Sequence, residues 1–322
     1  MKRALLAVVI VLLASPVAHS DFDATRTTLR DHVLKLINRD RQLYNLPPVQ
    51  LDLEASAIGD DYCLDQIRNA TNGHFGVDGL SPYMRYSFAG GNDGVSENAA
   101  AWSATYSFSD RALYEMARRS QDAMMAEMPP DDGHKRTILD PHATHVGIGL
   151  AWERGEFRLV HEFIRRYVSW TRPLPRRART TDTPLLSGRA VNGSTIEAIS
   201  VHHEDAPETM PAHVANAIAS YSLPKKRKEY LPRLKQEYTR HPNGSIEIVR
   251  REYPGGRRGD FYAGQDGAFS FSVPFTEGAG VYTVVVWVRK PGVEHPVAAS
   301  NISIRVDDAM PRQIRAGVVG SR

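Results

Sequence analysis

Several common structural and catalytic signatures are missing from this 322-residue chain. A single cysteine, Cys63, leaves no possibility of an intramolecular disulfide. There is no HExxH motif, no CxxC pair and no Gly-x-Ser-x-Gly elbow, so the usual signals of zinc proteases, cysteine-ligated zinc sites and serine hydrolases are absent. No internal repeat links the two halves of the chain. We therefore expect cores that hold without covalent help, with Cys63 buried and inert inside a helix.

An excess of one charge is missing as well. The chain has 40 Lys and Arg against 37 Asp and Glu, and Lys2 and Arg3 fall in a segment with the pattern of a secretion signal. That segment has a basic start, an apolar stretch at 4–14 and a small-x-small site at 18–20. We expect residues 1–20 to be removed and the protein to be secreted, periplasmic or extracellular. With the charges almost balanced, nucleic acid is not an expected partner, and no later apolar run has the roughly 18 residues of a transmembrane segment.

Apolar spacing predicts helices in the first half of the chain. One helix is expected from Thr25 to about Tyr44 and a second through Asn69. Residues 75–96, rich in glycine, are expected to form a long loop. The alanine-rich run that follows predicts another helix, with Glu97 at or near its start, and Ser109 is a candidate cap for a further helix.

The stretch from 133 to 163 carries a different, alternating pattern. Val146, Ile148 and Leu150 alternate with His145 and two glycines, and the alternation resumes at 157–163 after an Arg-Gly-Glu turn. This pattern predicts a β-hairpin with one face buried. His145 is expected at the start of its first strand and Glu162 late in its second strand. Helices followed by closing strands indicate an α+β fold up to about residue 170.

The pattern of predicted secondary structure changes after residue 170. Short β-rich runs recur between Asx-Gly turns, which is typical of an all-β, immunoglobulin-like sandwich. The predicted organisation is a signal peptide at 1–20, an α+β domain at 22–170, a linker at 171–184, a separate β-sandwich at 185–308 and a disordered tail at 309–322.

Candidate site residues lie near the ends of these predicted elements. His74 follows the end of a predicted helix, and Glu97 lies at the start of another. His145 lies at the start of a predicted strand, and an acidic residue falls within 127–132. Two imidazoles and two carboxylates that converge in one cleft can hold a divalent cation, with zinc as first choice and calcium as second. Without a metal, the same groups can perform general acid–base chemistry.

Five short motifs give the chain a resemblance to a known family. They are LINRDRQLYNLPPVQLD, GHFGVDGLSPYMR, SENAA, GHKRTIL and THVGIG. In this order they resemble the CAP superfamily, the SCP-like domain shared by cysteine-rich secretory, antigen 5 and pathogenesis-related proteins, and most closely its disulfide-free bacterial branch. The resemblance covers residues of about 27 to 170 and implies an α-β-α sandwich with a cleft lined by two histidines and two acids.

The resemblance also implies roles for single residues. His74 matches the first histidine of the family, Glu97 matches the glutamate of its Gly-Glu-Asn motif, and His145 matches the second histidine. Ser96 replaces the glycine that the family has before the glutamate.

The fourth cleft residue is left open by the motifs. Glu127 is the first choice, with Asp131 and Asp132 as alternatives, because the tryptophan that the family has before Gly-His is missing. His134, in the Gly-His motif, is expected to buttress the hairpin, and Glu162 is expected to support the site.

Three functions are compatible with these residues. The first is an exported binding protein whose cleft holds a divalent metal and a small or lipidic ligand, while the β-sandwich docks an extracellular protein or a surface. The second is a metal-dependent hydrolase with Glu97 as candidate base. The third is a degenerate scaffold whose working part is the β-sandwich.

Overall fold

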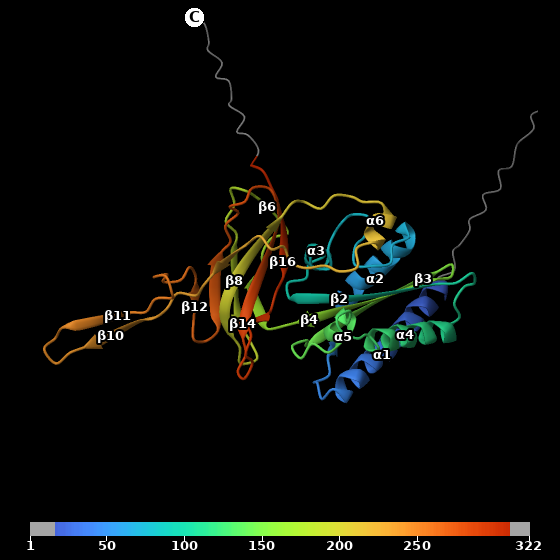
Figure 1. The fold of residues 1–322 in the computed structure, drawn as a ribbon, viewed down its shortest axis with the longest axis horizontal. Coiled ribbons are helices and arrows are strands. Elements are labelled where there is room, and N and C mark those ends of the chain that lie inside the picture. The colour runs from blue at the N-terminus through green and yellow to red at the C-terminus, as the bar shows by residue number, and fades with distance from the viewer. Residues whose placement is uncertain (1–16, 310–322) are drawn as a thin grey trace, which may run out of the picture.

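The computed structural model describes residues 17–309, which form an N-terminal α-β-α sandwich followed by two further sheets (Figure 1). Most of the predicted signal peptide (1–20) and of the predicted tail (309–322) lies outside the described residues, and positions 17–20 belong to the first helix. The first sheet has strand order β1-β3-β4-β2. Its strands are β1 (Gln50–Leu51), β2 (Gly94–Ser103), β3 (His145–Glu153) and β4 (Glu156–Arg165). The helices are α1 (Val17–Leu43), α2 (Leu53–Asn69), α3 (Pro82–Phe88), α4 (Asp110–Met125) and α5 (Gly133–Ile138).

Helices α1 and α4 cover one face of this sheet. Their apolar positions recur at helical spacing and share a core with the inward side chains of β3 and β4, such as Leu29, Leu113 and Ile148. Ser109 caps α4 by accepting a hydrogen bond from the Ala112 N–H. The predicted helices at 25–44 and from 109 are confirmed.

Helix α2 covers the opposite face of the hairpin. A Cβ atom on Gly149 would lie 2.2 Å from the backbone of Gly59, so α2 and β3 approach more closely than side chains would allow. The hairpin is confirmed, and its turn has Arg154 and Gly155 at φ 50° and 80°. The expectation that only one face of it is buried is wrong, because the glycine face lies under α2.

The predicted helix opening at Glu97 is wrong. Residues 94–103 form β2, which pairs with β4 over its whole length. Alanine has the highest helix propensity, but pairing with a central strand overrides that local preference. The expected loop at 75–96 also contains a helix, α3.

The C-terminal half contains two larger sheets, with orders β12-β13-β7-β5 and β6-β16-β14-β8-β9. Their strands are β5 (Val168–Arg172), β6 (Arg177–Arg179), β7 (Leu185–Ala190), β8 (Thr195–Glu204), β9 (Arg227–Tyr230), β12 (Tyr262–Ala263), β13 (Ala268–Ser272), β14 (Gly280–Arg289) and β16 (Ile302–Asp307), with β15 (Val297–Ala298) beside β14. Apolar residues of both sheets form one core. The immunoglobulin-like character stays a prediction. The linker predicted at 171–184 is wrong, because the end of β5 and all of β6 fall there and pair within the two sheets.

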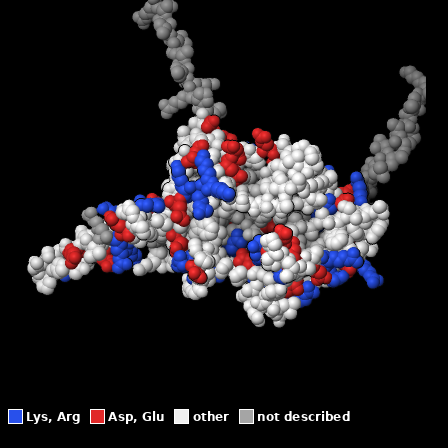
Figure 2. Space-filling model, in the orientation of Figure 1, with Lys and Arg blue, Asp and Glu red and all other residues white. Residues whose placement is uncertain are grey.

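A two-stranded ribbon, β10 (Gln236–Arg240) and β11 (Ile246–Arg250), projects from the C-terminal sheets (Figure 1). Acidic and basic side chains both occur over the two halves in the view of Figure 2. Among residues 17–309, no helix combines the length and apolarity that crossing a bilayer requires.

The two halves are in direct contact and are not separate. Asn301 of the C-terminal half exchanges two hydrogen bonds with the backbone of Val95, at 3.2 and 3.0 Å. Residues 205–224, most of the connection from β8 to β9, contain α6 (Ala212–Asn216) and lie against the N-terminal half beside α2 (Figure 1). We call residues 205–224 the strap.

Candidate functional site: two histidine–carboxylate pairs

The first pair is His74 with Glu97. Tight backbone turns after α2 place His74 below β2, and the Nδ1 atom of His74 lies 2.9 Å from Oε1 of Glu97. The second carboxylate oxygen of Glu97 accepts a hydrogen bond from Arg85 of α3. The Glu97 side chain has no exposed surface. Burial opposes its ionisation most strongly, but the charge of Arg85 and the hydrogen bond from His74 outweigh burial and lower the pKa of Glu97.

A second buried carboxylate, Glu162, lies directly opposite Glu97 on the neighbouring strand. Among residues 17–309, neither of its buried oxygens has a hydrogen-bond partner. Burial and then the negative charge of Glu97 raise the pKa of Glu162 well above its ordinary value, although Arg85 acts in the other direction. The two neighbouring carboxyl groups therefore have pKa values that move in opposite directions.

The second pair is His134 with Glu127. Glu127 accepts hydrogen bonds from the Nδ1 atom of His134 at 2.5 Å and from its backbone N–H at 2.9 Å. The second bond satisfies one of the free N–H groups at the start of α5. This pair is more open than the first, with 33% of the His134 side chain and 22% of the Glu127 side chain exposed.

The two pairs meet at the outer edge of the sheet. The ring centroids of His74 and His134 lie 6.0 Å apart, with 32° between the ring planes. A carboxylate can only accept a hydrogen bond, so each Nδ1 carries a proton, and the tautomer that this bond selects leaves Nε2 as the nitrogen with a lone pair for a metal ion. Within residues 17–309, neither Nε2 atom makes a hydrogen bond to the protein.

His145 does not join this cluster. Its Nδ1 atom lies 2.9 Å from the hydroxyl of Thr144, and its surroundings include Arg166, Asp52 and Asp93. His145 is two strands and two residues from Glu97, about 12 Å between α-carbons at ordinary strand spacings. Burial, followed by the charge of Arg166, lowers its pKa. The imidazole that lies beside His74 is that of His134, whose backbone carbonyl also accepts a hydrogen bond from Asn98 of β2.

The acidic residues take different positions from those expected of direct ligands. Glu97 and Glu127 each hold a histidine by Nδ1, while Asp132 lies 3.3 Å from Arg136 in a surface ion pair and Asp131 is exposed. Within the described part of the chain, no three His, Cys, Asp or Glu side chains are grouped as ligands of one ion. Any metal at this site would therefore have two protein ligands, the histidines. The carboxylates of Glu97 and Glu127 would hydrogen-bond to those histidines and would not bind the metal directly.

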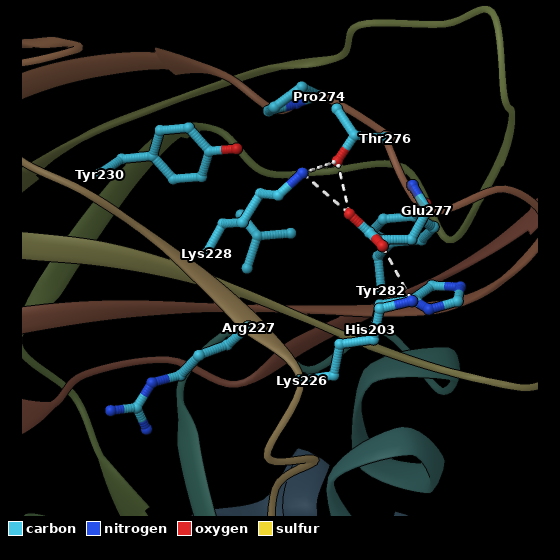
Figure 3. Close-up of a pocket in the computed structure, with 10 residues that line it drawn as sticks. His203, Lys226, Arg227, Lys228, Tyr230, Pro274, Thr276, Glu277 and Tyr282 are labelled. Carbon is cyan, nitrogen blue, oxygen red and sulfur yellow. Dashed lines mark hydrogen bonds and ion pairs between the residues drawn. The ribbon is translucent and has the colours of Figure 1, made fainter.

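A separate cavity of about 180 Å³ lies at the β9 edge of the C-terminal sheets (Figure 3). Lys226 and Lys228 line it, and both bind the carboxylate of Glu277 at 2.8 Å. The lysine charges in this cavity are therefore partly balanced within the protein, and nothing here links it to the histidine pairs.

Comparison with known proteins adds a partial likeness. A solved SCP-domain structure is similar in part. It is an extracellular protein containing an SCP domain from Bacillus anthracis str. Ames, 17% identical to this chain with a TM-score of 0.32. The similarity covers 44% of this chain and 41% of that chain, so this chain matches less than half of the length of the Bacillus anthracis protein. No protein-family model and no curated protein matches the chain.

Two residues around Glu97 were not predicted from the sequence. Arg85 ends the GHFGVDGLSPYMR motif but lies in the stretch expected to be a loop, and Tyr221 lies in the C-terminal half, 124 positions from Glu97. The Gly-His motif marks His134 in the sequence. The alternating pattern of the following strand, however, favoured His145 as the second histidine.

Proposed function

We propose that the protein is an exported binding protein whose two histidine–carboxylate pairs bind a divalent metal ion, with zinc as first choice. The observation that carries this proposal is the arrangement of His74 and His134, each fixed at Nδ1 by a carboxylate and each free at Nε2. Carboxylate–histidine–metal triads have this arrangement, because the outer hydrogen bond sets the tautomer and raises the basicity of the ligand nitrogen.

The spacing of the rings fits a shared ion. An imidazole that binds zinc at 2.0–2.1 Å has its centroid roughly 3.2 Å from the ion, so two such rings lie at most roughly 6.4 Å apart. The observed 6.0 Å lies below that limit. With two protein ligands, the remaining coordination positions would go to water or to a small ligand. Calcium is a poorer fit, because it prefers oxygen ligands.

The geometry gives less support to a hydrolase. Both oxygens of Glu97 are engaged and its side chain has no exposed surface, so it is poorly placed to take a proton from bound water. Docking of a protein or surface by the C-terminal sheets, a lipidic ligand and the degenerate-scaffold alternative stay predictions.

Zinc binding by calorimetry tests the proposal. Wild-type protein, purified without chelators and then stripped with EDTA, is titrated with zinc beside the His74→Ala, His134→Ala double variant. We expect zinc affinity to fall at least tenfold in the double variant, because both nitrogen ligands are removed. Equal affinity in the double variant would refute the proposal, as would absence of binding by the wild type.

His145→Ala is the matched control. It removes one imidazole of the same sheet face without touching either pair. We expect its zinc affinity to equal that of the wild type. A large loss in His145→Ala, with none in the double variant, would return the site to the residue that the motifs first indicated.

A further inference from the structure

We propose that Tyr221, from the C-terminal half, is a positioning residue of the two-histidine site, so that the site is completed by both halves of the chain. The inference rests on the proposed function for its metal readout. Its geometric basis is the contact of Tyr221 with both members of the first pair. The backbone N–H of Glu97 donates a hydrogen bond of 2.6 Å to the Tyr221 hydroxyl, and the Tyr221 ring meets the His74 ring edge-on with centroids 4.9 Å apart.

The reason for the hydrogen bond lies in the sheet topology. Strand β2 is the last strand in the order β1-β3-β4-β2, so the N–H groups on its outer side have no strand partner. The C-terminal half supplies the missing partners, with Asn301 at Val95 and Tyr221 at Glu97. The backbone that carries the Glu97 carboxylate is thus fixed from outside its own sheet.

The strap holds Tyr221 in this position through several contacts. The backbone N–H of Met210 donates to the carbonyl of Val77 at 2.8 Å. The Asn216 side chain binds the backbone of Asn72 and of Ala70, each at 3.0 Å. These contacts join the strap to the N-terminal half at two residues that precede Tyr221.

Further along, the Tyr83 hydroxyl donates to Glu204 at 3.0 Å and lies 3.4 Å from the carbonyl of Ser222, the residue next to Tyr221. The strap is therefore joined to the N-terminal half on both sides of Tyr221.

The Tyr221 ring also affects how accessible each histidine is to solvent. The His74 side chain is 10% exposed beside Tyr221, whereas the His134 side chain is 33% exposed. The imidazole of His134 is therefore the more accessible of the two.

Two variants separate the parts of this role. Tyr221→Phe keeps the ring against His74 and removes the hydroxyl that accepts the Glu97 N–H, whereas Tyr221→Ala removes both. Tyr253→Phe is the matched control, because it removes a tyrosine hydroxyl that donates to the carbonyl of Pro232 in the C-terminal half, outside the strap. Outer-shell partners of metal ligands alter metal affinity by about 10- to 100-fold. We expect zinc affinity to fall about tenfold in Tyr221→Ala, by less in Tyr221→Phe, and to stay unchanged in Tyr253→Phe.

Two measurements on metal-free protein keep the test independent of zinc. In NMR spectra, the His74 ring protons should shift in Tyr221→Ala, which lacks the neighbouring aromatic ring, and should keep their wild-type shifts in Tyr221→Phe. The Glu97 amide should exchange with solvent at least tenfold faster in Tyr221→Phe than in Tyr253→Phe.

If the wild type binds no zinc but both NMR results hold, the proposed function fails and the positioning contact stands. The inference itself is overturned if the His74 shifts and the Glu97 exchange are the same in all variants. Zinc binding that His74 and His134 support but that Tyr221→Ala leaves at wild-type strength would overturn the positioning role alone.

Discussion

Arg85→Met gives the sharpest test of the buried charge cluster. Arg85 supplies the positive charge beside Glu97, and its guanidinium carbon lies 3.3 Å from the ring centroid of Tyr62. Methionine keeps an apolar side chain against that ring and removes the charge. The carboxylate of Glu97 then remains in a fully buried position with only His74 as partner.

Two independent routes give the size of the effect. A pair of unit charges at about 4 Å and an effective dielectric constant of about 20 interact by about 4 kcal/mol. The variant can instead protonate Glu97, which costs about 1.4 kcal/mol per pH unit above its ordinary pKa of 4.5, or about 3.4 kcal/mol at pH 7. We therefore expect the unfolding free energy to fall by about 3–4 kcal/mol at pH 7, as is usual when one partner of a buried ion pair is removed.

The sign of the pH dependence follows from the pKa of Glu97. In the wild type this pKa is lowered, so its contribution to stability is present above the unfolded value and is lost only as the pH falls below 4.5 through the folded pKa. In Arg85→Met the folded pKa is raised, so protonation becomes cheap as the pH approaches 4.5. The difference between the two proteins should therefore shrink by about 3 kcal/mol from pH 7 to pH 4.5.

Urea unfolding followed by tryptophan fluorescence at both pH values measures this difference. Arg118→Met, which removes an exposed arginine paired with Glu115 and Asp122 on α4, is the control and should unfold close to the wild type. A loss below about 1 kcal/mol at pH 7, or an equal loss at both pH values, would refute the account of the cluster.

Three further predictions follow from buried positions. Gly149→Ala should lose about 1–3 kcal/mol or more in thermal unfolding, because its Cβ would lie 2.2 Å from Gly59, whereas Gly133→Ala, with nothing within 4 Å, should not. Cys63 should react with a thiol reagent only after denaturant is added, since it is fully buried and burial raises its thiol pKa; reaction at the rate of a free thiol in native protein would contradict this. Burial lowers the pKa of His161 to about 3, so the unfolded chain binds a proton that the folded chain excludes and stability should fall by about 1.4 kcal/mol per unit from pH 6.5 towards 3. His161→Leu should remove that slope in urea unfolding at successive pH values, and an unchanged slope would show that His161 is not its source.

Much of the local structure could be predicted from the sequence. The helices α1, α2 and α4 and the β3–β4 hairpin follow from apolar periodicity, capping residues and a turn with positive φ, all of which act within a few residues. Strand β2 could not be predicted in this way, because its alanines favour a helix and only pairing with β4 makes it a strand.

Part of this cluster could also be predicted from the sequence. His74 and Glu97 lie in motifs shared with the family and do form a pair, whereas the motifs left the choice of Glu127 open. The pairing of His134 with Glu127, which removes His145 from the site, depends on how α5 lies against the edge of β2.

What the sequence by itself determined is therefore the chemistry at hand: two imidazoles and their carboxylates, on a chain with one thiol and balanced charge. The tertiary structure decided which histidine lies beside His74, which carboxyl group has a raised pKa, and that Arg85 and Tyr221 complete the surroundings of Glu97. The physical reason is range. Caps, turns and periodicity act between near neighbours, whereas burial, charge compensation and edge-strand hydrogen bonds join residues that the chain keeps as many as 124 positions apart.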